Sequence, residues 1–304
     1  MKAAVTVLVF VAFALTPARA VQRNVLLIIA DDYGIDANSL YNTSPGAALP
    51  PTPNINALKS SGVMFRNCYA MPTCSPTRAT MLTGRNPYRH GVTTALTAND
   101  GQLLAGEFTL PRAFAANPSL GYSTASLGKW HLTLGPTANI ANDPANIAGW
   151  PHYAGCLTGT LVGGSGGTGN YTAWTKTING VTGAANGTTT YATTDTTDDA
   201  VAWIAARGSS PWFLWVGYNA PHTPFHKPPD ALHTYDTTVT NWASLPINNN
   251  ATNQRTHRNA AVEAMDTEIG RLLSSMTPAV RANTMVIFVG DNGSPNQVIQ
   301  TPFG

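Results

Sequence analysis

The chain has 304 residues, of which 17 are Lys or Arg, 15 are Asp or Glu and 3 are Cys. Charged residues make up 11% and hydrophobic residues 43%, so the charged fraction lies far below the roughly 25% of an average soluble protein. This composition excludes a coiled coil, a charge-rich disordered chain, a nucleic-acid binder with a basic surface and a disulfide-rich scaffold. The length accommodates one large α/β domain or two smaller ones.

Residues 1–20 have the layout of a secretory signal peptide. Lys2 precedes an apolar run from Ala3 to Leu15, and a small-x-small sequence ends at Ala20. The run is too short for a membrane-spanning helix, and a buried N-terminal helix is the alternative interpretation; no other segment approaches a membrane span. We expect a secreted or periplasmic protein, or a lysosomal one in a eukaryote. Cleavage after Ala20 leaves equal numbers of acidic and basic residues, so no affinity for nucleic acid is expected.

Apolar runs alternate with helix-start signals along the rest of the chain. Residues 24–30 (NVLLIIA) form a largely apolar, β-branched run, which is typical of a strand buried on both faces. Thr52-Pro53 and the segment from Thr109 to Pro111 indicate helix starts. The predicted strands are 24–30, 63–69, 122–127, 212–218 and 285–290, and the predicted helices are 52–62, 109–117, 197–207 and about 262–276. This alternation predicts an α/β fold with a doubly wound, largely parallel sheet flanked by helices.

One long segment breaks this alternation. Between Thr158 and Thr194 the only charged residue is Lys176, amid Gly, Thr and Asn. We expect either an irregular or β-rich insertion on the rim of the sheet, or a flexible surface loop.

Polar residues gather where the predicted strands end. In an open parallel sheet, ligands bind outside the carboxyl ends of the strands. The residues that follow the predicted strands are Asp31, Asp32, Lys129, His131, His222, Asp291 and Asn292. Because the chain has so few charges, their concentration at one edge indicates a functional site.

The oxygen side chains of this set suit a hard metal ion. Asp and Asn oxygens are typical ligands of Ca²⁺ or Mg²⁺, and the absence of a neighbouring His or Cys pair argues against zinc. Asp31-Asp32 taken alone also fits a helix cap or a turn. His131 and His222 taken singly fit core histidines, whereas their shared position at strand ends favours function.

Residues 74–85 (CSPTRATMLTGR) carry the most specific motif. The C-x-P-x-R pattern followed by L-T-G resembles the signature of the type I sulfatases, in which the cysteine is oxidised to formylglycine. The other elements that resemble this family are Asp31-Asp32, Gly128-Lys129-Trp130-His131 after Gly121, Ala220-Pro221-His222-Thr223-Pro224, and Asp291-Asn292-Gly293. Five elements in the family's order cover residues 24–293, so the chain resembles an arylsulfatase-like member of the alkaline-phosphatase superfamily.

The resemblance implies sulfate ester hydrolysis. A formylglycine-generating enzyme would convert Cys74 during maturation, and one hydroxyl of the aldehyde hydrate would attack the sulfur while the alcohol leaves. The second hydroxyl would then expel sulfate and restore the aldehyde. One Ca²⁺ per chain would be held by Asp31, Asp32, Asp291, Asn292 and residue 74. Arg78 would make the attacking hydroxyl more acidic, Lys129 would bind a sulfate oxygen, His222 would protonate the leaving alcohol, and His131 would accept a proton in the second half.

Family members usually have a second sulfate-binding Lys after the Asp-Asn-Gly element and a small C-terminal domain, and the sequence to Gly304 has neither. Residues 21–304 are therefore expected to be the N-terminal catalytic domain of a longer protein, with the C-terminal domain missing. A formylglycine-dependent phosphate or phosphonate monoester hydrolase and an inactive sulfatase-like binding fragment stay as alternatives. Cys74 and Asn292 argue against a two-zinc phosphatase.

The substrate stays open among aryl, sugar and polysaccharide sulfates, that is, a sulfated small molecule or glycan. The two cysteines outside the motif, Cys68 and Cys156, allow either a disulfide or two buried thiols.

Overall fold

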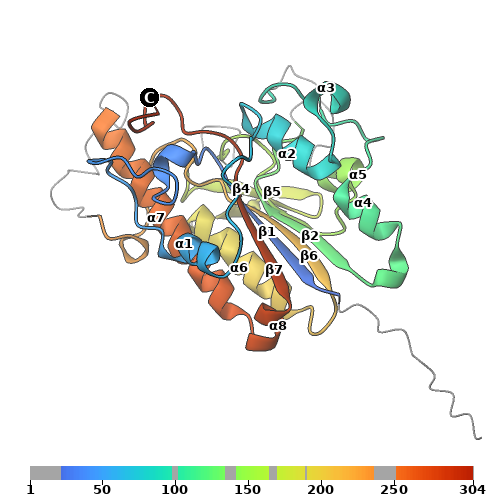
Figure 1. Cartoon of the computed structure of the whole chain (residues 1–304). Helices are drawn as coiled ribbons and strands as arrows, with labels where there is room; N and C mark the ends of the chain where they lie inside the picture. Colours follow the sequence, from blue (N-terminus) through green and yellow to red (C-terminus); the bar gives the residue numbers. More distant parts are fainter. Residues whose placement is uncertain are drawn as a thin grey trace, which may run out of the picture.

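The computed structural model describes residues 22–97, 102–133, 142–163, 170–188, 190–235 and 251–303. These residues form a seven-stranded sheet with helices on both faces (Figure 1), in the strand order β5-β4-β3-β2-β6-β1-β7. The predicted signal peptide lies outside the described residues. Within them, no helix combines the length and the apolar character needed to cross a membrane.

Five neighbouring strands of the sheet, from β3 to the edge strand β7, run parallel to one another. They are β1 (Asn24–Ala30), β2 (Ser123–Gly128), β3 (Tyr153–Gly155), β6 (Trp212–Gly217) and β7 (Thr284–Gly290). Successive residues of β1 face opposite cores, because Leu26 and Ile28 belong to one hydrophobic cluster and Leu27 and Ile29 to the other. Burial on both faces is what the apolar sequence of this strand predicts.

The helices divide between the two faces of the sheet (Figure 1). One face carries α1 (Pro53–Ser60), α6 (Ala192–Ala205), α7 (Ala251–Ser275) and α8 (Pro278–Ala282). The other carries α2 (Cys74–Thr83), α3 (Pro87–His90), α4 (Leu110–Ala115) and α5 (Asp143–Ala148). Short 3-10 turns are η1 (Ile35–Ala37), η2 (Pro118–Leu120) and η4 (Asp230–Leu232). The predicted doubly wound, largely parallel sheet flanked by helices is confirmed.

The segment between Thr158 and Thr194 contains a hairpin of β4 (Trp174–Ile178) and β5 (Val181–Thr188). It extends the sheet antiparallel to β3, so the β-rich alternative is the correct one for the described part. Lys176 of β4 lies 2.5 Å from Asp195 Oδ1 and 2.6 Å from Asp199 Oδ2, both on α6. The lone charge of the segment therefore fastens the hairpin to a helix.

The predicted strand at 63–69 is wrong. The segment is irregular, with Val63, Phe65 and Tyr69 exposed. Apolar and aromatic residues form a strand only where a neighbour completes the hydrogen bonding, and none of the described strands pairs with this segment. Cys68 lies here as an exposed free thiol and Cys156 is a buried one, so the structure has neither the disulfide nor two buried thiols.

The register of the parallel strands brings their carboxyl ends together. Ala30 pairs with Gly290, Ile29 with Gly217, and Gly217 with Gly128. Glycine is needed at the last contact, because a Cβ on Gly128, whose φ is +86°, would lie 2.0 Å from the carbonyl oxygen of Gly217. The residues that follow β1, β2, β6 and β7 consequently meet at one edge.

Candidate active site

Two buried ion pairs lie at this edge of the sheet. The Lys129 ammonium contacts the Asp31 carboxylate, and both side chains are fully buried. Nε and Nη2 of Arg78 each lie 2.9 Å from Asp291 Oδ2, again with both side chains fully buried. Nη1 of Arg78 donates to the carbonyl oxygen of Lys129 at 2.9 Å. Arg78 therefore connects α2 to the ends of β2 and β7.

The two cations of these ion pairs, Lys129 and Arg78, keep their charges despite burial. Burial alone would lower the pKa of Lys129 and of Arg78, but the carboxylates beside them raise both above their ordinary values. Burial, reinforced by the charge of Asp31, raises the pKa of Asp291 to about 6. The two ion pairs and Asp32 together form a charge cluster. It contains three carboxylates and two cations, so its formal charge is negative.

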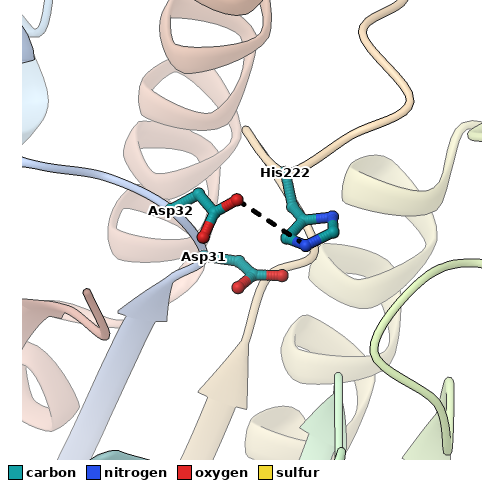
Figure 2. A group of neighbouring side chains, drawn as sticks. All are labelled: Asp31, Asp32 and His222. Atoms are coloured by element: carbon teal, nitrogen blue, oxygen red, sulfur yellow. Dashed lines mark ion pairs between the residues drawn. The ribbon is translucent and has the colours of Figure 1, made fainter. Parts of the chain in front are cut away.

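Asp32 joins the first and last strand ends. Its φ of 57° lies in the left-handed region, which residues with a side chain seldom adopt. Its N–H donates to Asp291 Oδ1 at 3.1 Å, and its Oδ1 accepts from Asn292 Nδ2 at 2.6 Å. These bonds hold the turn in its unusual conformation. Its Oδ2 lies 3.6 Å from Nε2 of His222 (Figure 2).

Two acidic side chains and a histidine form a candidate metal site. Asp31, Asp32 and His222 each offer one ligand atom, and these atoms lie within 4.8 Å of one another (Figure 2). Asp31 Oδ1 and Asn292 Oδ1 are buried without a hydrogen-bond partner. A buried oxygen left in that state costs about 1–3 kcal/mol. Two such oxygens beside a negative cluster fit a cation bound by hard ligands.

Cys74, the first residue of α2, contacts His131. Its Sγ lies 3.0 Å from His131 Nδ1, and His131 Nε2 lies 3.0 Å from the carbonyl oxygen of Leu96. Since a carbonyl only accepts, Nε2 carries the proton of the neutral ring, and Nδ1 accepts from the thiol. Burial, followed by the charge of Lys129, lowers the pKa of His131 to about 2, so the ring stays neutral. Burial also raises the pKa of the Cys74 thiol.

Two supporting groups could not be found from the sequence. A Cβ at Gly159 would lie 2.5 Å from Cε1 of His131, so only glycine allows the ring to lie where it does. The Leu96 carbonyl fixes the other side of the same ring. A backbone carbonyl has no sequence signature, and a single glycine in a glycine-rich segment carries no distinguishing signal.

The predicted site residues come together in contacting pairs. These are Cys74 with His131, Arg78 with Asp291, Lys129 with Asp31, His222 with Asp32, and Asn292 with Asp32. Their elements are α2 and the segments after β1, β2, β6 and β7. His222, to which the resemblance assigns only proton transfer, also lies beside the acidic pair.

Known proteins are similar to this chain in sequence. Residues 23–299 match the family model described as Sulfatase. The chain is 30% identical to N-acetylgalactosamine-6-sulfatase of Canis lupus familiaris over 306 residues, 90% of this chain and 52% of that protein. It is 38% identical to arylsulfatase A of Bos taurus over 122 residues, 39% of this chain and 23% of that protein.

Solved structures have the same fold. Ps i-CgsB has a TM-score of 0.70 at 25% identity, covering 92% of this chain and 61% of its own. PsFucS1 sulfatase from Pseudoalteromonas sp. has a TM-score of 0.66 at 22% identity, covering 90% and 55%.

The fold and the edge site define an alkaline-phosphatase-like α/β protein. Within that class, the chain belongs to the sulfatase family. It spans about half the length of the curated N-acetylgalactosamine-6-sulfatases that it matches, which it covers to 52% and 50%.

Replacing Lys129 by Met tests the buried charge network. Without the ammonium, Arg78 is the only cation of the cluster facing three carboxylates, so Lys129→Met should lower the free energy of unfolding by about 3–5 kcal/mol. Urea unfolding followed by circular dichroism measures the change. The control is Lys59→Met on the exposed side of α1, which should cost less than about 1 kcal/mol. Equal losses in the two variants would contradict the network.

Proposed function

We propose that the protein hydrolyses sulfate esters to an alcohol and inorganic sulfate, with formylglycine at position 74. The observation that carries this proposal is the contact between Cys74, at the start of α2, and the unprotonated Nδ1 of His131 at 3.0 Å. The contact supports the proposal because a basic nitrogen lies beside the cysteine that conversion to formylglycine would make the nucleophile. Once formed, the hydrate of formylglycine supplies the attacking oxygen.

In the same proposal one Ca²⁺ is held by Asp31, Asp32, Asp291, Asn292 and the modified residue 74. Support comes from the hard oxygen donors and from the partnerless buried Oδ1 atoms of Asp31 and Asn292. When bound, the ion supplies positive charge toward the sulfate and the nucleophile.

The two buried cations would interact with the negative charges of the sulfate and of the attacking hydroxyl. Lys129 would pair with a non-bridging sulfate oxygen, a contact that serves every sulfate ester alike. Arg78, fixed by Asp291 and by the Lys129 carbonyl, would favour the anionic form of the hydroxyl at residue 74. Burial and ion pairs hold both cations in place.

The two histidines would move protons at opposite ends of the reaction. His131 accepts at Nδ1, the atom nearest to residue 74, and would take a hydroxyl proton there as sulfate is released. In His222, Nδ1 lies 2.8 Å from the Thr223 carbonyl and donates to it, which leaves Nε2 directed at Asp32. In its protonated form, His222 would give the Nε2 proton to the leaving alcohol.

The proposed substrate is a sulfated glycan or a small sulfate ester. The support is 30% identity over 90% of the chain to a relative named N-acetylgalactosamine-6-sulfatase. The proposal includes residues 1–20 as a signal peptide, residues 21–304 as the catalytic domain, export to the periplasm, exterior or lysosome, and a formylglycine-generating enzyme as maturation partner. Its support is the layout of the first twenty residues and the cysteine motif.

The first test concerns the nucleophile. Cys74→Ala should abolish sulfate ester hydrolysis and leave the fold largely intact, because the side chain is small. Hydrolysis of an aryl sulfate and circular dichroism measure the two effects, and mass spectrometry of the peptide with residue 74 reports its modification. Cys68→Ala, at an exposed thiol, is the control and should keep wild-type activity. Normal turnover by protein shown to lack formylglycine would remove residue 74 from this role.

The second test concerns the metal. Chelation should reduce activity and added Ca²⁺ should restore it, with one calcium per chain by elemental analysis. Independently of activity, a Ca²⁺ concentration about 100 times the dissociation constant should stabilise the fold by about 2.7 kcal/mol, seen as a higher melting temperature. Asp31→Asn should weaken that stabilisation. Two tightly bound zinc ions per chain would contradict the proposal and favour a phosphatase.

The third test concerns His222. If it protonates the leaving oxygen, His222→Ala should slow esters of weakly acidic alcohols by about 10²–10⁴ and slow esters of acidic phenols far less, since a stable phenolate needs little help. Rates on aryl sulfates of graded phenol acidity measure this. A dependence on phenol acidity no steeper than in the wild type would exclude the acid role.

A further inference from the structure

The segment that carries His222 is held by a side chain from the β-rich insertion. His222 N donates to the carbonyl oxygen of Asn219 at 3.0 Å, which closes a turn directly after β6. The hydroxyl of Tyr171 lies 2.6 Å from that same Asn219 oxygen and 2.9 Å from the carbonyl oxygen of His222. One phenol therefore contacts the first and the last residue of the turn.

Tyr171 is suited to donate to these two carbonyls, which share its single hydroxyl proton in a bifurcated hydrogen bond. Its side chain is buried, and burial raises the pKa of the phenol well above its ordinary value, so the hydroxyl keeps its proton. Its own backbone is anchored, because Ala192 N at the start of α6 donates to the Tyr171 carbonyl at 2.8 Å. The donor thus belongs to a fixed part of the fold.

An aromatic cluster fixes the ring of Tyr171. The rings of Tyr171 and His226 are stacked, with centroids 3.6 Å apart and planes at 18°. His226 Nδ1 donates to the Pro224 carbonyl at 3.0 Å, so Nε2 accepts from the Tyr191 hydroxyl, also at 3.0 Å. Burial lowers the pKa of His226 to about 3, which keeps this ring neutral.

The direction of the His222 ring depends on the backbone of this turn. His222 Nδ1 donates to the carbonyl of the next residue, Thr223, at 2.8 Å, so the ring is oriented by its own main chain. Its side chain is 19% exposed, and the other ring nitrogen faces Asp32 at 3.6 Å. A shift of the turn would therefore also move Nε2 of His222.

We propose that Tyr171 is a positioning residue for His222: its buried hydroxyl holds the carbonyls of residues 219 and 222 and so directs Nε2 into the site. This inference rests on the proposed function, in which His222 protonates the leaving alcohol. It gives the insertion a role in the reaction, at a residue that lies outside the five sulfatase-like sequence elements.

The test compares two phenol deletions in the matured, formylglycine-containing protein. Tyr171→Phe keeps the ring and its stack on His226 and removes the hydroxyl from the turn. Tyr191→Phe is the matched control, since its hydroxyl bonds His226 and neither of the two turn carbonyls. On aryl sulfates of graded phenol acidity, Tyr171→Phe should lower kcat about tenfold for the poorest leaving groups and less than about twofold for the best. Tyr191→Phe should lower every rate by the same small factor.

A second comparison separates positioning from general destabilisation. In a His222→Ala background, Tyr171→Phe should cause no further loss on any ester, because the group it positions is gone. Near-ultraviolet circular dichroism matching the wild type establishes that each variant is folded. A loss that is equal across leaving groups, or that persists in the His222→Ala background, would overturn the inference and leave the proposed function standing. If the wild-type protein does not hydrolyse sulfate esters, or if His222→Ala leaves the hydrolysis rate unchanged, the proposed function is wrong. The inference about Tyr171 then fails with it.

Discussion

The geometry of the site depends on the guanidinium of Arg78. Its planar group reaches from α2 to Asp291 after β7 and to the carbonyl of Lys129 after β2, and it does so fully buried. Relative to apolar packing, a buried ion pair adds little stability, yet removal of one partner is costly. The fixed donor geometry of Arg also restricts where α2 can begin, and residue 74 is the first residue of that helix. One side chain thereby connects the helix that begins at residue 74, the proposed nucleophile, to two strand ends.

The two histidines of the site differ in their burial and in their hydrogen-bond partners. His131 is buried with both ring nitrogens in contact, so its tautomer is fixed and its charge is suppressed. His222 is partly exposed and directs Nε2 toward a carboxylate. Under the proposed function, these two rings transfer protons at opposite ends of the reaction. The β-rich insertion supports one of them through Tyr171, whereas the Leu96 carbonyl and Gly159 support the other.

The sequence predicts most of the sheet and the membership of the site, because both follow from local patterns. The apolar run of β1 and the polar residues after each strand need only parallel topology to bring Asp31 and Asp291 together. The strand expected at 63–69 fails because propensity without a pairing strand is insufficient. The contact between Tyr171 and the Asn219 carbonyl joins residues that are far apart in the sequence. Because its acceptor is a backbone atom, which every residue has, no local sequence pattern predicts it.

Under the proposed function, the burial of Cys74 restricts when this residue can be converted to formylglycine. The residue is 5% exposed and its thiol contacts His131, so under the proposed function a modifying enzyme would have no access to it in the finished fold. Under the proposed function, a molecule that closes around an unconverted thiol keeps it for as long as α2 stays in place. The fraction of converted protein would then depend on the relative rates of cysteine oxidation and folding during synthesis, and a later supply of the maturation enzyme would not change it.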